Sequence, residues 1–229
     1  MSVALTAALS LSASAFSEPP GPAQERRASA RPPAPSLSRP TSAARQTDAN
    51  GFIRRWLLLE PIRIPGQLTQ PAVRSAVEQD FPLSPGPLPR DGDTLAVGGA
   101  TLAWHAVDTA NYNVNLYHFA YGLNKPTSNV LFWATTVVTS PIEMPGVRLA
   151  IGSNAASVWW VNGKEATALY NDRQTVIDDG VSKRLTLNKG ANVIRAAIIN
   201  AGGATDFCAR FLDEHDRPIK GLTVTLAGR

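Results

Sequence analysis

From residue 52 onward, short apolar runs alternate with Gly, Asn and Asp residues that favour turns. About ten of these runs have the length of a strand, and they recur at the 8–12-residue spacing typical of β-sandwiches. No helical segments alternate with them, which argues against the βαβ units of a parallel-sheet enzyme fold. The pattern predicts an all-β jelly-roll sandwich of about ten strands.

Two turns are specified most clearly. Asn162-Gly163 and Gly98-Gly99 each stand between strand-like runs, and these residue types tolerate the positive φ angles of a tight hairpin turn. We also expect strands over residues 114–120 and 175–177. A single short helix is predicted near residues 69–80, because Thr69 can cap it and Pro71 suits its first turn.

The first fifty residues differ in kind from the rest. Residues 1–16 form a short apolar segment that ends in Ala13-Ser14-Ala15 and resembles a secretory signal, although it lacks a basic start. The alternative is a plain Ala/Ser-rich leader. Residues 17–50 are rich in Pro, Ala, Ser and Arg and predict a disordered linker. We therefore place the folded domain at residues 51–229 and expect the protein to be secreted or periplasmic.

Charge and cysteine content exclude several classes of function. The net charge is +4, and part of it lies on scattered arginines before residue 51, so no basic stripe for nucleic acid is present. The apolar stretch at residues 3–16 is too short to span a membrane. Cys208 is the only cysteine, which excludes an intramolecular disulfide and a cysteine-based zinc site. We expect it to be a small buried residue.

Several stretches resemble a known family. They are V-W-W-V-N-G-K at residues 158–164, L-T-L-N-K-G-A-N-V-I at 185–194, W-L-L-L-E-P at 56–61 and the segment 206–218. Together they resemble galactose-binding-like jelly-roll domains, of the type that accompanies acetylxylan-esterase-like enzymes, over residues 51–229. The resemblance implies a non-catalytic, carbohydrate-binding accessory module of a secreted polysaccharide-degrading system. Its implied partners are a polysaccharide or oligosaccharide and a hydrolase domain or subunit.

Sugar binding requires an aromatic surface with polar groups beside it. Trp159 and Trp160 must point to opposite faces of their strand, and we expect Trp159 in the core. Trp160 then becomes a candidate sugar platform, unless it packs on the outer face. The other candidates follow the same hairpin in sequence: Tyr170, Asn171, Asp172 and Arg173. Tyr112, Tyr117 and Tyr121 form a second aromatic cluster. For each aromatic, packing within the sandwich is the competing interpretation.

Other chemistries have weaker signals. A structural calcium ion would need oxygen ligands, and the available carboxylates are Asp172, Asp178, Asp179 and Asp206, whose spacing fits no calcium loop. No cofactor, catalytic residue or metal motif is predicted. His105 and Asp108 are close in sequence but lack a clear nucleophile.

Two alternatives to sugar binding stay open. The first is a structural module that packs on a carbohydrate-esterase or glycoside-hydrolase domain and has no sugar affinity of its own. The second is an intrinsic esterase or glycosidase, for example with Glu143 and Asp172 as a carboxylate pair.

Overall fold

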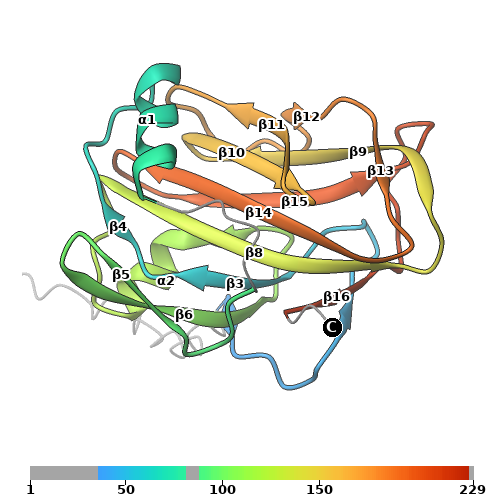
Figure 1. Ribbon diagram of the computed structural model, residues 1–229, viewed down its shortest axis with the longest axis horizontal. Helices are drawn as coiled ribbons and strands as arrows, with labels where there is room; N and C mark the ends of the chain where they lie inside the picture. The colour runs from blue at the N-terminus through green and yellow to red at the C-terminus, as the bar shows by residue number, and fades with distance from the viewer. Residues whose placement is uncertain (1–35, 81–87, 227–229) are drawn as a thin grey trace, which may run out of the picture. The chain divides into compact units, whose positions relative to one another are not determined.

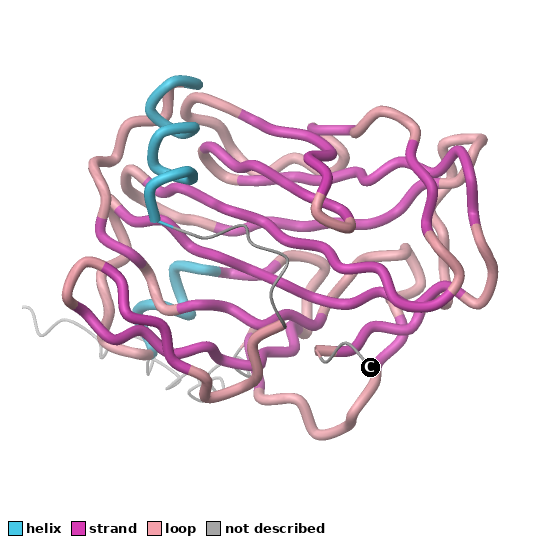
Figure 2. The backbone as a smooth tube through the Cα atoms, in the orientation of Figure 1, coloured by secondary structure: helices cyan, strands magenta, loops and turns pink. Residues whose placement is uncertain are grey.

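The computed structural model describes residues 36–80 and 88–226. In them the chain forms two antiparallel β-sheets packed into a sandwich, with two short helices (Figures 1 and 2). The predicted all-β sandwich is confirmed. Among the described residues, nine strands have four or more residues, and the rest are two- or three-residue pairings. Neither helix in this part of the chain has the length and apolar character that a bilayer crossing requires.

The large sheet has eleven strands, seven of which follow the order β1-β6-β3-β8-β14-β10-β11. Its strands are β1 (Leu37–Ser38), β2 (Arg45–Gln46), β3 (Arg55–Leu59), β4 (Ile62–Arg63), β5 (Thr94–Val97), β6 (Ala100–Thr109), β8 (Val130–Ser140), β10 (Ala156–Val161), β11 (Lys164–Leu169), β14 (Gly190–Asn200) and β16 (Thr223–Thr225). The small sheet has five: β7 (Val114–Asn115), β9 (Met144–Ser153), β12 (Gly180–Val181), β13 (Leu185–Leu187) and β15 (Asp206–Leu212). The predicted turn at Asn162-Gly163 joins β10 to β11, with φ of 51° and 78°.

The inner core lies between the two sheets, and three aromatic rings form its centre. Trp56 on β3 and Trp159 on β10 meet Phe207 on β15, with centroid separations of 5.1–6.0 Å and edge-to-face angles. All three are fully buried. The indole N–H of Trp159 donates to the Ser157 hydroxyl at 3.0 Å, and that of Trp56 donates to the carbonyl of Ile53 at 3.0 Å. These rings join the two layers without leaving a buried donor unpaired.

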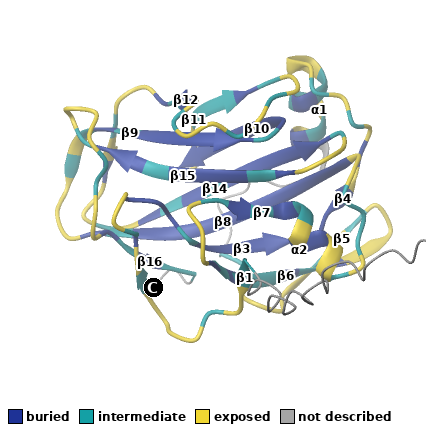
Figure 3. Cartoon of the chain, turned by 180° about the vertical axis from the view of Figure 1, so that it is seen from behind, coloured by how far each residue is buried: buried dark blue, intermediate teal, exposed yellow. Residues whose placement is uncertain are grey.

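An outer core covers the other face of the large sheet. Helix α1 (Gln70–Asp80) places Val73 and Val77 against a cluster that includes Trp133 and Trp160. The prediction of a short helix near residues 69–80 is therefore confirmed. Because of this cover, the middle strands are buried on both faces: ten of the eleven residues of β8 are buried (Figure 3).

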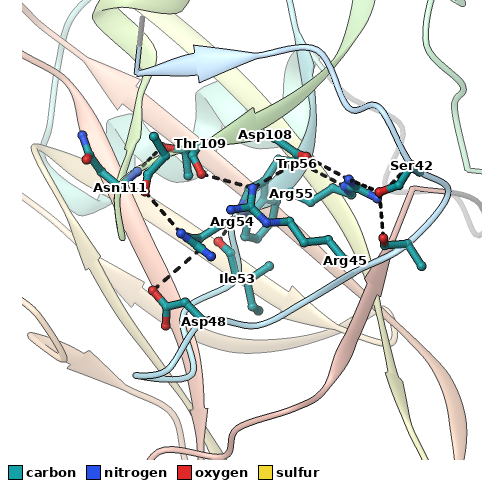
Figure 4. Close-up of polar contacts among 12 residues, drawn as sticks. Ser42, Arg45, Asp48, Ile53, Arg54, Arg55, Trp56, Asp108, Thr109 and Asn111 are labelled. Atoms are coloured by element: carbon teal, nitrogen blue, oxygen red, sulfur yellow. Dashed lines mark hydrogen bonds and ion pairs between the residues drawn. The ribbon is translucent and has the colours of Figure 1, made fainter. Parts of the chain in front are cut away.

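Residues 36–50, which we assigned to a linker, form part of the sandwich. β1 pairs with β6, and β2 pairs with β16. Figure 4 shows how the intervening loop is held: the Arg55 guanidinium makes two 2.8 Å bonds to Asp108 and donates to the carbonyl of Ser42 at 2.9 Å. Backbone pairing and this ion pair replace the apolar burial that the sequence lacks here. Residues 1–35, with the signal-like segment and the rest of the linker, lie outside the described residues.

Two expected strands do not form over the predicted residues. At residues 114–120, only Val114 and Asn115 pair as β7, and helix α2 (Leu116–Gly122) follows. The Asn115 side chain caps this helix by accepting from the His118 amide at 2.7 Å, and Leu116, Phe119 and Ala120 face the core at helical spacing. Residues 175–177 pair with no strand. They cross the outside of the small sheet, where the carbonyl of Val176 lies over Gly152.

The Arg55–Asp108 pair yields a stability prediction. Asp108→Ala leaves the Arg55 side chain, 1% exposed, as a buried charge without its carboxylate. We expect the free energy of unfolding in urea to fall by about 3–5 kcal/mol. The control is Asp216→Asn, which removes a carboxylate that is 47% exposed, keeps a residue that tolerates the φ of 59° at this position, and should cost less than about 1 kcal/mol. Equal losses in the two variants would contradict this assignment.

Candidate functional site

Trp160 occupies the face we predicted but is not available as a platform. It points away from Trp159, into the outer core, where its ring stacks on Trp133 at 5.7 Å between centroids. Only 6% of Trp160 is exposed. α1 and its neighbours cover the face on which the ring lies, so in this conformation the ring is not accessible for stacking on a sugar.

Tyr170, Asn171, Asp172 and Arg173 follow β11 and serve mainly to connect elements. The Tyr170 ring is half-buried against the outer core, with the Arg74 guanidinium of α1 5.8 Å from its centroid. The backbone N–H of Asn171 donates to the carbonyl of Leu68, and the Arg173 side chain forms an ion pair with Asp179. Asn171 and Asp172 are exposed. The structure therefore does not gather these four residues with Trp160 around one exposed aromatic face.

Three of the four carboxylates considered for calcium have other partners within the described residues. Asp178 pairs with Arg210, Asp179 pairs with Arg173, and Asp206 accepts from Asn113 and Thr175. Within residues 36–80 and 88–226, no group of three or more His, Cys, Asp or Glu side chains is placed to hold a metal ion. Asp178 and Asp206 bind the 171–179 loop to β15 of the small sheet, whereas the Arg173–Asp179 pair lies within the loop.

A pocket between β6 and α2 combines buried aromatic rings with polar groups. It has a volume of about 460 Å³ and is called the α2 pocket below. Its lining residues come from β1 and the residue after it, from the turn before β5, from β6, and from α2 and the residue after it: Leu37, Ser38, Arg39, Asp91, Gly92, Trp104, His105, Ala106, Val107, His118, Phe119, Gly122 and Leu123. Such a volume lies within the range of small-ligand sites.

The polar groups of the α2 pocket are fixed by their neighbours. Asp91 accepts from the amide of Ala106 at 2.8 Å and pairs with Arg39. The hydrogen bond from the Ala106 backbone amide has the largest effect and lowers the pKa of the Asp91 carboxyl. Burial raises this pKa by a smaller amount, and Arg39 lowers it further. Asp91 is therefore a charged acceptor at neutral pH. His118 is exposed at the opposite wall. The site offers donors and acceptors that suit hydroxyl groups.

Beside this pocket, α2 presents an aromatic pair. Tyr117 and Tyr121 are one helical turn apart, and their rings lie parallel, with 7° between planes and 6.1 Å between centroids. The Tyr117 ring also contacts His118, which lines the pocket. Tyr121 is 68% exposed. The pair therefore presents a supported, solvent-facing ring next to a polar pocket.

Next to the pocket, Glu60 contacts both His105 and Lys125. One of its oxygens lies 3.3 Å from His105 Nε2, and the other lies 2.9 Å from Lys125 Nζ. Burial acts to raise the pKa of the Glu60 carboxyl, but the bonds from Lys125 and His105 outweigh it and hold the pKa below its ordinary value. His105 thus pairs with Glu60, and Asp108, its neighbour in sequence, pairs with Arg55.

Sequence reasoning recognised Tyr117 and Tyr121 as aromatics but missed their arrangement. A strand places residues four apart on one face about 13 Å from each other, whereas a helix stacks them. The available signal was Asn115 followed by apolar residues at helical spacing, which is a helix N-cap pattern. The contribution of residues 37–39 to the pocket had no signal, because it depends on the pairing of β1 with β6.

No protein-family model matches the chain, and no curated protein matches its sequence. Among solved structures, the PA14 sugar-binding domain from an RTX adhesin has a TM-score of 0.41 at 10% identity, covering 74% of this chain and 96% of that domain. The PA14 domain of the MpAFP antifreeze protein has a TM-score of 0.40 at 8% identity, covering 75% and 91%.

A third structure is β-glucosidase from Kluyveromyces marxianus in complex with glucose, with a TM-score of 0.34 at 18% identity. The match covers 48% of this chain and 14% of the enzyme's length. TM-scores this low leave fold and function to be argued from the residues themselves, and the resemblance to acetylxylan-esterase-associated domains stays a prediction.

The buried thiol yields a second prediction. Burial raises the pKa of Cys208 to about 12, so at pH 8 only about one thiol in 10⁴ is ionised. We expect the native protein not to react with Ellman's reagent over an hour, and the urea-unfolded protein to release one equivalent of thiolate colour within minutes. Rapid reaction of the folded protein would show that the 171–179 loop and the small sheet do not protect the sulfur.

The Glu60 network yields a third prediction. A carboxyl whose folded pKa is lowered stabilises the fold above its unfolded pKa of about 4.3, and this stabilisation is lost as the pH falls through the folded pKa. Glu60→Gln should therefore reduce the free energy of unfolding at pH 7, and its difference from wild type should shrink between about pH 5 and pH 3. A difference that is constant with pH would indicate packing alone.

Proposed function

We propose that this chain is a carbohydrate-binding accessory module of a secreted or periplasmic polysaccharide-degrading system, and that it binds sugar at the α2 pocket and the adjoining tyrosine pair. The observation that carries the proposal is the exposed ring of Tyr121 stacked on Tyr117. A sugar ring has an apolar face of C–H groups that packs on an aromatic ring, while its hydroxyls need hydrogen bonds at the edge.

The supporting ring improves the platform. Tyr117 lies parallel beneath Tyr121 and limits its rotation, so less side-chain entropy is lost when a sugar binds. His118 and the Arg39–Asp91 pair then lie on the pocket side of the helix, where they can bond to hydroxyls. We assign no catalytic residue to this site. The role is to raise the concentration of an attached or associated hydrolase on its polymer.

Affinity electrophoresis tests the platform. The full chain is run in native gels cast with xylan, galactan or β-glucan, and its retardation is compared with that of Tyr121→Ala. We expect the variant to bind the retarding polymer about tenfold more weakly, a loss of ~1.4 kcal/mol. The fold should not change, because Tyr121 contributes to neither core.

Tyr112→Ala is the matched control, because Tyr112 is also exposed, at 41%, but its ring packs at a tilt against Phe52 outside the α2 pocket. It should retain wild-type retardation. If Tyr121→Ala and Tyr112→Ala behave alike, the platform is misplaced. If no polymer retards the wild type, the alternative of a structural module without sugar affinity, which packs on a hydrolase domain, is favoured.

A further inference from the structure

A second concave site lies where the edges of the two sheets approach each other. β11 ends the large sheet, and β13 pairs with the outer side of β9 in the small sheet. Between β11 and the segment leading into β13 is a cleft of about 800 Å³, called the edge cleft below. Its apolar lining is Val161, Ala166 and Leu185, which belong to the inner core or pack against it. The cleft is thus separate from the α2 pocket.

The free charges in the edge cleft are positive. Lys164 and Lys183 are exposed, and neither makes an ion pair with the residues that the structure describes. Among the described residues, the one carboxylate in the lining is that of Glu165, and both terminal guanidinium nitrogens of Arg74 bond to it, one of them at 2.7 Å. Arg184 is held by the carbonyl of Gly146 at 2.7 Å and by Asp216. Two cations therefore face the cleft without a counter-charge.

Uncharged polar groups accompany these lysines. Thr186 and Asn188 are exposed, and their side chains make no hydrogen bond within the described residues. One wall is rigid: the Asn162 side chain donates to Asn192 at 2.8 Å and accepts from the amide of Val193 at 2.9 Å. The cleft therefore combines free hydroxyl and amide groups with two unpaired cations on a wall held in place before a ligand binds.

We propose that the edge cleft binds the anionic groups of an acidic polysaccharide, carboxylates or sulfates carried on a sugar chain. Lys164 and Lys183 pair with the anions, while Thr186 and Asn188 bond to sugar hydroxyls. Among the residues that the structure describes, no aromatic side chain lines the cleft, so neither a nucleobase nor a neutral sugar ring can stack there. The proposed binding therefore comes from the two lysines and the acidic groups of the polymer, with hydrogen bonds to its hydroxyls. The choice of a polysaccharide as the ligand rests on the proposed function, whereas the location of the cleft and its two unpaired lysines do not depend on it.

The test measures binding of the full chain to polygalacturonate, which carries carboxylates, to dextran sulfate, which carries sulfates, and to a neutral galactan. The cleft variant is Lys164→Ala with Lys183→Ala. The control, Lys220→Ala with Arg63→Ala, removes two exposed cations elsewhere. Because all four side chains are exposed, both variants should fold, which circular dichroism checks. A charge-keeping variant, Lys164→Arg with Lys183→Arg, serves as rescue.

We expect the cleft variant to bind at least one acidic polymer about tenfold more weakly, with a shallower dependence of affinity on salt. The control and the rescue should bind as the wild type does. If the cleft variant loses affinity for polygalacturonate, the ligand group is a carboxylate. If it loses affinity for dextran sulfate, the ligand group is a sulfate. Equal losses in the cleft and control variants, or no affinity for either acidic polymer, would overturn the proposal.

Two further arms separate this inference from the proposed function. Tyr121→Ala should weaken galactan binding without changing the lysine dependence, so failure of the tyrosine platform and failure of the edge cleft give different patterns. A single-stranded oligonucleotide is run as a competitor. If it binds with the same lysine dependence while both acidic polysaccharides do not, the cleft is a nucleic-acid site and the proposal is wrong.

Discussion

The structure depends on one constraint: the middle of the large sheet is apolar on both faces and must be covered twice. Ten of the eleven residues of β8 are buried, and β10, next to β14 in the same sheet, is buried throughout. Since exposed apolar surface of that extent is costly in water, the small sheet covers one face and α1 with its neighbours covers the other. The aromatic triad of Trp56, Trp159 and Phe207 fixes the first contact, and the Trp133–Trp160 stack belongs to the second.

This double cover decides where ligands can bind. A sandwich with one face open could present Trp160 to a polymer, but here that face is closed. Concave, partly polar surface remains at the margins of the layers. At one margin, α2 and the β1 segment enclose the α2 pocket, and at another the uncovered edges of β11 and β13 leave the edge cleft. The buried pair of Arg55 and Asp108 supports the first margin, because it holds the loop that follows β1.

The two margins differ in chemistry, and this follows from their local sequences. α2 is rich in aromatic residues, so its pocket suits a sugar ring with neutral hydroxyls. The strands and loops around the edge cleft carry lysines, and the one acidic side chain in its lining is already bound by α1. A polymer with both apolar sugar faces and acidic groups could use both sites, and simultaneous contact would raise its apparent affinity above that of either site alone.

The sequence by itself determined the all-β sandwich, the helix near residues 69–80, the hairpin at Asn162-Gly163 and the opposite orientation of Trp159 and Trp160. These features follow from local periodicity and from backbone angles that few residues tolerate. Tertiary structure alone decided that the face of Trp160 is covered, that residues 37–39 line a pocket, and that Lys164 and Lys183 share a cleft. Each depends on contacts between segments far apart in the chain, and alternation within one strand tells which residues share a face but not what lies against that face.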